Sequence, residues 1–188
     1  HMLIAFSFSS FIAVRLSGFR TGTLTSPFIR HYTDRIQIDG RDIPPEALCR
    51  FCEQVQACPV SQDCSQFEIT FAIALLWFVE QKCDLVVLET GLGGRCDATN
   101  IVPHKLVAAI TKIGYDHMEV LGDTLDKIAA EKAGIIKKSI PVIIGEHDER
   151  CDPVFAEVAA TNKSKLLHAE ELFTCTGQEP AGERQLFH

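Results

Sequence analysis

Three short apolar runs constrain the fold of this chain most strongly: DLVVLE at residues 84–89, LVAAITKIG at 106–114 and IPVIIG at 140–145. Their apolar residues do not alternate with polar ones, so each run is expected to be a strand buried on both faces. A helical pattern, TLDKIAAEKAGIIKK, separates the last two runs. This alternation predicts an α/β fold with a mostly parallel sheet flanked by helices.

The first half of the chain is expected to add elements to this sheet. RTGTLTSP predicts a short strand that ends at Pro27, and DRIQIDGRDI predicts a small hairpin that turns at Asp39 and Gly40 and projects from the sheet. Pro45 marks the first turn of a helix. SQFEITFAIALLWFVEQK is apolar almost all round, which predicts a buried helix with Trp77 in the core.

Residues 3–175 are expected to form one domain. The apolar segment at 3–19 carries Arg15 and is too short to span a bilayer, so a helix of a soluble protein that ends near Gly18 is expected. Residues 1 and 2 resemble the remnant of an expression tag. Residues 176–188 lack periodicity and are expected to be a loose tail.

Composition argues against several classes of protein. The formal net charge of −7 disfavours a broad nucleic-acid surface. The eight cysteines are dispersed and no cleavable signal sequence precedes them, so reduced thiols in a cytoplasmic protein are expected. Cys49 and Cys52 have C-x-x-C spacing, but they fall in an expected helix without a clean second pair, which favours ordinary thiols over a zinc site.

Polar residues follow three of the expected strands at the point where each strand ends. Ser26 follows the first strand, Glu89 follows residues 85–88, and Asp116 and His117 follow residues 106–110. Parallel strands bring these ends to one edge of the sheet, where oxygen ligands suit Mg²⁺ and the glycines of ETGLGGRCDATN let backbone N–H groups approach a phosphate. These residues alone leave a tight turn and a capping histidine as the alternative.

Longer motifs decide between these alternatives. TSPFIRHYTDRIQIDGRDI, ETGLGGRCDATN and TKIGYDHMEVLGDTLDKIAAEKAGIIK, in this order along the chain, resemble the folylpolyglutamate synthase and dihydrofolate synthase family of the Mur ligase superfamily, over roughly residues 15–145. The resemblance implies a central ATP-binding domain related to the P-loop NTPases. It also implies ATP and Mg²⁺ as cofactors, and folate or dihydropteroate and glutamate as substrates. In that family ATP phosphorylates a carboxylate, and the amino group of glutamate attacks the acyl phosphate.

The resemblance also assigns site residues. Ser26, Glu89 and His117 match residues that hold Mg²⁺ near the nucleotide phosphates. Lys132 matches a lysine that is carbamylated in many members, and a carbamate could hold a second Mg²⁺. Lys132 and His117 are therefore the expected catalytic residues, and Ser26 is counted with the cofactor-binding residues.

Three further residues belong to the segments that carry the resemblance. Asp97 is expected to orient the metal ligands, and Asn100 to terminate the cofactor-binding loop. Arg35 lies in a segment that resembles the cover of the folate site, where it would pair with a carboxylate.

Two family features are absent from the 188 residues: a phosphate loop of the form G-T-N-G-K-G-S and a C-terminal Rossmann-like domain. The expectation is therefore a truncated, inactive fragment whose missing first strand exposes a sheet edge and permits self-association. Two alternatives stay open: a non-catalytic binding or assembly module, and another Mur-type amide ligase. Phosphate release with folate and glutamate would distinguish a ligase from the non-catalytic module. Binding of a nucleotide-sugar peptide would indicate the other Mur-type ligase.

Overall fold

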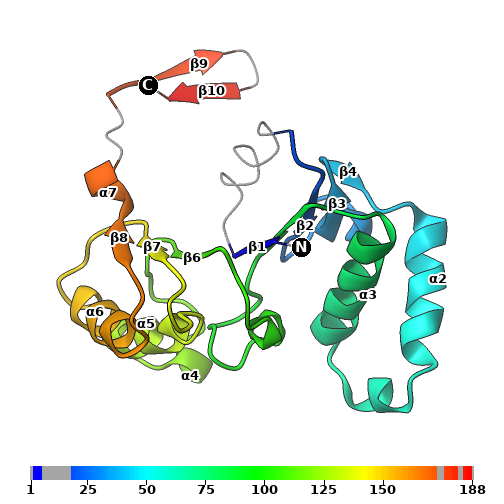
Figure 1. The fold of residues 1–188 in the computed structure, drawn as a ribbon, viewed down its shortest axis with the longest axis horizontal. Coiled ribbons are helices and arrows are strands. Elements are labelled where there is room, and N and C mark those ends of the chain that lie inside the picture. The colour runs from blue at the N-terminus through cyan, green and yellow to red at the C-terminus, as the bar shows by residue number, and fades with distance from the viewer. Residues whose placement is uncertain (1, 6–17, 173–175, 182–183, 188) are drawn as a thin grey trace.

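The computed structural model describes residues 2–5, 18–172, 176–181 and 184–187. Within them, eight strands form one sheet in the order β4-β3-β2-β5-β1-β6-β7-β8, and all neighbours from β2 to β8 pair in parallel (Figure 1). The strands are β1 (Met2–Ala5), β2 (Thr21–Leu24), β3 (Ile36–Ile38), β4 (Arg41–Asp42), β5 (Leu85–Leu88), β6 (Val107–Ile110), β7 (Val142–Ile144) and β8 (Leu166–His168). The mostly parallel α/β sheet is confirmed.

The helices form two groups, one at each end of the sheet (Figure 1). Beside β2–β4 lie α2 (Pro45–Gln56) and α3 (Gln66–Glu80), and beside β6–β8 lie α4 (Met118–Leu121), α5 (Leu125–Ala133), α6 (Asp152–Thr161) and α7 (Ala169–Leu172). Short 3-10 helices, η1 (Tyr32–Arg35), η2 (Pro59–Asp63) and η3 (Ala98–Ile101), complete the connections. The helix beginning at Pro45 and the buried helix after Ser65 are confirmed.

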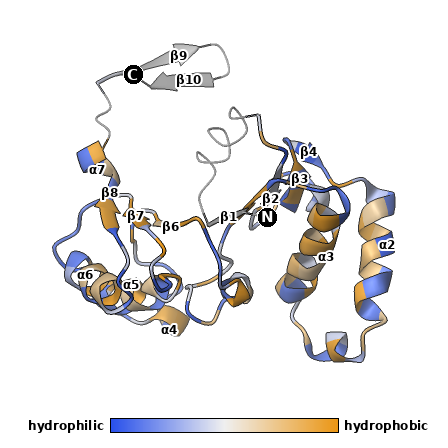
Figure 2. Cartoon of the chain, in the orientation of Figure 1, coloured by the Kyte–Doolittle hydropathy of each residue, from blue (hydrophilic) through white to orange (hydrophobic). Residues whose placement is uncertain are grey.

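Each helix group closes one hydrophobic core. Trp77 and Phe78 of α3 pack with Leu88 of β5 in the first core, as expected for Trp77. Figure 2 shows hydrophobic colour along most of α3, whereas α2 is mixed. The contact between α3 and β2 is close enough that a Cβ on Gly22 would lie 2.6 Å from the Phe78 ring. The second core joins β6 and β7 to α5 and α6, and it includes Phe155.

The N-terminal segment differs from the expected helix. Residues 2–5 form β1, which lies between β5 and β6, with Met2 opposite Leu85 and Ala5 opposite Leu88. The apolar run Leu3–Ala5 suits a strand in the middle of a parallel sheet, a position that periodicity cannot distinguish from a buried helix. The sheet was expected to lack its first strand and to have an exposed edge as a result, and both expectations are wrong. The rest of the expected helix, residues 6–17, lies outside the described residues.

Two other expectations are corrected by strand pairing. The hairpin of β3 and β4 does turn at Asp39 and Gly40, both with positive φ, but it continues the main sheet through β2 and does not project from it. Within residues 176–188, β9 (Gln178–Ala181) and β10 (Arg184–Phe187) pair antiparallel where a loose tail was expected.

No disulfide joins the seven described cysteines, and Cys175 lies outside the described residues. No helix among the described residues is long and apolar enough to cross a bilayer.

Candidate functional site

An open cleft of about 640 Å³ lies at the carboxyl ends of the central strands. Ser26 after β2 and the glycine loop after β5 form part of its wall. The amino end of α3 and residues of α4 and α5 complete it. Because β2 and β5 run parallel, with Leu24 opposite Leu88, the loops after both strands leave at the same edge of the sheet.

Ser26 and Glu89 meet beside this cleft. The backbone N–H of Ser26 donates to Glu89 Oε2 at 2.8 Å. Burial raises the pKa of the half-buried Glu89 carboxyl, and the hydrogen bond from Ser26 opposes that rise. No described side chain forms an ion pair with Glu89. A half-buried carboxylate without a cationic partner fits a bound cation, so the residues present are suited to Mg²⁺.

Arg35 contacts Ser26 and differs from its expected role. Its guanidinium donates to Ser26 Oγ at 3.2 Å and lies 5.9 Å and 5.5 Å from the ring centroids of Phe28 and Tyr32. Among the described residues it has no carboxylate partner, because the nearby Asp34 is occupied by backbone N–H groups of residues 29–31. Arg35 therefore adds positive charge to the wall of the cleft.

Asp97 organises the glycine loop. One carboxylate oxygen accepts from the N–H groups of Gly91 and Leu92, both at 3.0 Å, and the other accepts from the N–H and hydroxyl of Thr99 at 2.9 and 2.6 Å. This carboxylate also lines the cleft, but its described partners are backbone and hydroxyl donors. Its expected role in orienting metal ligands is not tested by these contacts.

Asn100 joins the same loop to the end of α5. Its side-chain amide donates to the carbonyl oxygens of Arg95, at 2.9 Å, and Gly134, at 3.2 Å. The glycine loop lies so close to α5 that a Cβ on Gly94 would be 2.9 Å from the Glu131 carbonyl oxygen. Asn100 thus acts as a tether between loop and helix, and its expected part in cofactor binding stays a prediction.

His117 and Lys132 lie in segments that flank the cleft. His117 has φ 47° at the N-cap of α4, whose Val120 and Leu121 line the cleft, and its exposed ring pairs with Asp116 at 3.7 Å. Lys132 is half-buried in the last turn of α5. Ile128 and Ala129 of the same helix lie in the core that contains residues of β6 and β7. Convergence of His117 and Lys132 on Glu89 remains a prediction.

Lys105 is a residue of this region that sequence reasoning missed. It is 7% exposed, and its ammonium donates to the Ile135 carbonyl at 3.2 Å and to Asn100 Oδ1 at 3.4 Å. Burial, aided by repulsion from Lys137, lowers the pKa of Lys105 from 10.5 to about 8, and Asp97 only partly offsets this. A lysine directly before an apolar strand carries no sequence signal that it will be buried.

The lowered pKa predicts an unusual pH dependence of stability. From pH 8 to 10.5 the unfolded chain keeps the Lys105 proton that the folded chain has lost, so Lys105 makes folding more favourable as pH rises through this window. Between these pH values, the wild type should gain free energy of unfolding relative to Lys105→Met. The gain should be at most about 1.4 kcal/mol per pH unit. Urea denaturation at several pH values measures this, with the exposed Lys138→Met as control. The prediction would be contradicted if the free energy of unfolding changed with pH equally in Lys105→Met and Lys138→Met.

Comparison with known proteins places this arrangement in a family. A family model described as the Mur ligase middle domain matches residues 51–171. The chain belongs to the Mur ligase middle-domain family. A dihydrofolate synthase/folylpolyglutamate synthase of Bacillus subtilis is 37% identical over 180 residues, covering 91% of this chain and 42% of that protein. The folylpolyglutamate synthase of Lacticaseibacillus casei is 34% identical over 178 residues, covering 91% of this chain and 41% of its own length.

Solved structures agree with this assignment of the Mur ligase middle domain. The apo form of L. casei FPGS superposes with a TM-score of 0.88 at 32% identity, covering 99% of this chain and 49% of that one. The FPGS-AMPPCP-folate complex has the same score and identity, and 48% of that chain is covered. The resemblance to folylpolyglutamate and dihydrofolate synthases is thus confirmed, and the chain spans less than half the length of these relatives.

Proposed function

We propose that this Mur ligase middle domain serves an ATP- and Mg²⁺-dependent ligase that adds glutamate to folate or dihydropteroate. The observation that carries the proposal is Glu89, a half-buried carboxylate without an ionic partner among the described residues, bonded to Ser26 beside a cleft at the sheet edge. The relatives support the substrates, since one is solved with AMPPCP and folate and others are named as folylpolyglutamate synthases. ATP would phosphorylate the folate carboxylate, and glutamate nitrogen would then displace phosphate.

In this proposal the residues of the cleft have separate tasks. Ser26, Glu89 and His117 hold Mg²⁺, and carbamylated Lys132 holds a second ion. The bound ions would neutralise phosphate charge as the phosphoryl group moves. Asp97 and Asn100 keep the glycine loop in place beside the nucleotide.

We further propose that the 188-residue chain by itself does not complete the reaction. It contains no sequence of the form G-T-N-G-K-G-S, so the lysine and backbone donors that such a loop gives to ATP phosphates are not supplied by these residues. Assays with ATP, folate and glutamate should remain at blank level. Turnover that is lost in Glu89→Ala would overturn this part of the proposal while supporting the metal site.

The metal site is tested by binding, which does not depend on turnover. Mn²⁺ is the probe, because its paramagnetism reports occupancy of an oxygen-rich Mg²⁺ site. Glu89→Gln should weaken Mn²⁺ binding in the presence of ATP by at least about tenfold, which corresponds to roughly 1.4 kcal/mol. The matched control is Glu119→Gln on the exposed surface of α4, which should bind as the wild type does. Equal affinity of Glu89→Gln and wild type would contradict the assignment.

A further inference from the structure

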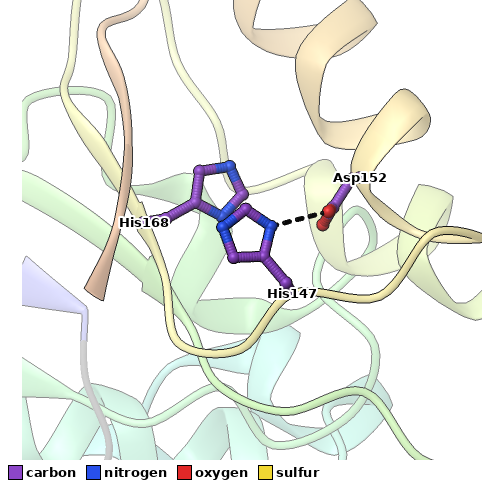
Figure 3. A group of neighbouring side chains, drawn as sticks. All are labelled: His147, Asp152 and His168. Carbon is purple, nitrogen blue, oxygen red and sulfur yellow. Dashed lines mark hydrogen bonds and ion pairs between the residues drawn. The ribbon is translucent and has the colours of Figure 1, made fainter. Parts of the chain in front are cut away.

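A cluster of metal-binding side chains lies apart from the described lining of the cleft, at the β8 edge of the sheet. His147 follows β7, Asp152 begins α6 and His168 ends β8, so three consecutive elements meet there (Figure 3). One potential ligand atom of each lies within 4.8 Å of the others. We propose that His147, Asp152 and His168 form a binding site for a divalent transition-metal ion of the zinc class.

The donor set selects this class of ion. Two imidazole nitrogens and one carboxylate oxygen suit Zn²⁺, Co²⁺ or Ni²⁺, whereas Mg²⁺ prefers oxygen ligands alone. Three protein ligands leave a fourth position for water or a further carboxylate. Glu171 of α7 can supply that carboxylate, since its Oε1 lies 3.8 Å from His147 Nε2. The site is thus chemically distinct from the cleft at Glu89.

The second observation is an unused nitrogen. His168 Nδ1 is buried and has no hydrogen-bond partner in the described structure, although buried polar atoms are normally paired. When the proton of the His168 ring is on Nε2, Nδ1 has a free lone pair. His147 Nδ1, by contrast, is engaged with Asp152 Oδ2 at 2.9 Å, as the dashed line in Figure 3 shows.

The ring geometry shows what metal binding requires. The imidazoles of His147 and His168 are stacked, with centroids 3.8 Å apart and planes 7° from parallel (Figure 3). Nitrogen lone pairs lie in the ring plane, so two stacked rings cannot both point at one ion. One ring must turn. His147 can do so, because its side chain is 45% exposed and it lies in the loop between β7 and α6. The bound metal would then link the edge strand β8 to α6 through His168 and Asp152.

Co²⁺ titration of the purified, untagged chain, kept reduced with a phosphine, tests the site through visible ligand-field absorption. We expect one Co²⁺ per chain, and at least tenfold weaker binding in His147→Gln and His168→Gln. His104→Gln, at an exposed histidine outside the cluster, is the matched control and should bind normally. Circular dichroism checks folding, and the exposed His147 variant decides the question if His168→Gln does not fold.

Two competing sites are separated by further variants. Cys49→Ser with Cys52→Ser removes the C-x-x-C pair of α2, and Glu89→Gln removes the carboxylate beside the cleft. Both should retain Co²⁺ binding without thiolate charge-transfer bands. Wild-type affinity in His147→Gln, or loss of Co²⁺ binding in either competing variant, would overturn the proposal.

Discussion

Gly134→Ala is expected to lower the free energy of unfolding by about 3 kcal/mol, the upper part of the usual range for overpacking. Gly134 follows α5 with φ −58°, a conformation that alanine adopts freely. Helix propensity alone would therefore predict a gain of about 1 kcal/mol. The contact decides the opposite sign, because a Cβ there would lie 2.5 Å from Cα and Cβ of Arg95 and 2.8 Å from its nitrogen.

Backbone atoms of Arg95 cannot move aside as the end of a flexible side chain could. The Arg95 N–H donates to the Glu131 carbonyl at 2.9 Å, and Asn100 bonds both Arg95 and Gly134. The substitution should therefore separate the glycine loop from α5 and weaken the cleft. Urea denaturation measures the loss. Gly114→Ala is the control, since no described atom other than those of Gly114 and its chain neighbours lies within 4 Å of its Cβ position. It should stay within about 0.5 kcal/mol of wild type. A Gly134→Ala protein as stable as wild type would rule out this close approach.

Phe155→Ala should cost about 3–5 kcal/mol, the usual range for removing a buried phenylalanine. Phe155 is 1% exposed and lies in the core that joins β6 and β7 to α5 and α6. The lost ring leaves a cavity that the surrounding strands cannot fill without moving. Because α5 carries Lys132, a loosened core should also disturb that side of the cleft.

The single tryptophan makes this experiment more informative. Trp77 belongs to the other core, so its fluorescence reports the half of the molecule that Phe155 does not touch. If the sheet unfolds as one unit, Phe155→Ala shifts the fluorescence and circular dichroism midpoints equally. Phe19→Ala, at a residue 47% exposed, is the control and should shift neither strongly. A fluorescence midpoint left at the wild-type value would mean that the two cores unfold independently.

The sequence alone was sufficient to predict those parts of the fold that depend on local apolar pattern and on the direction of the strands. The apolar runs at residues 85–88, 107–110 and 142–144 became parallel strands, since strands buried on both faces leave a continuous apolar signal. Parallel pairing then brought Ser26 and Glu89 together, as the strand ends predicted. The family motifs predicted the family, which periodicity cannot do, and the comparisons agree with that assignment.

Tertiary structure decided everything that depends on which distant segments pair. Residues 2–5 are too few to show a period, and the partners that make them a strand are 80 or more residues away, at Leu85 and Val107. Lys105 carries no mark of burial, because its environment is made by Ile135 and Asn100. His147 and His168 are separated by a helix in sequence and stack only because β7 and β8 are neighbours. Long-range contacts of this kind are set by the packing of the whole sheet, which no short window of sequence contains.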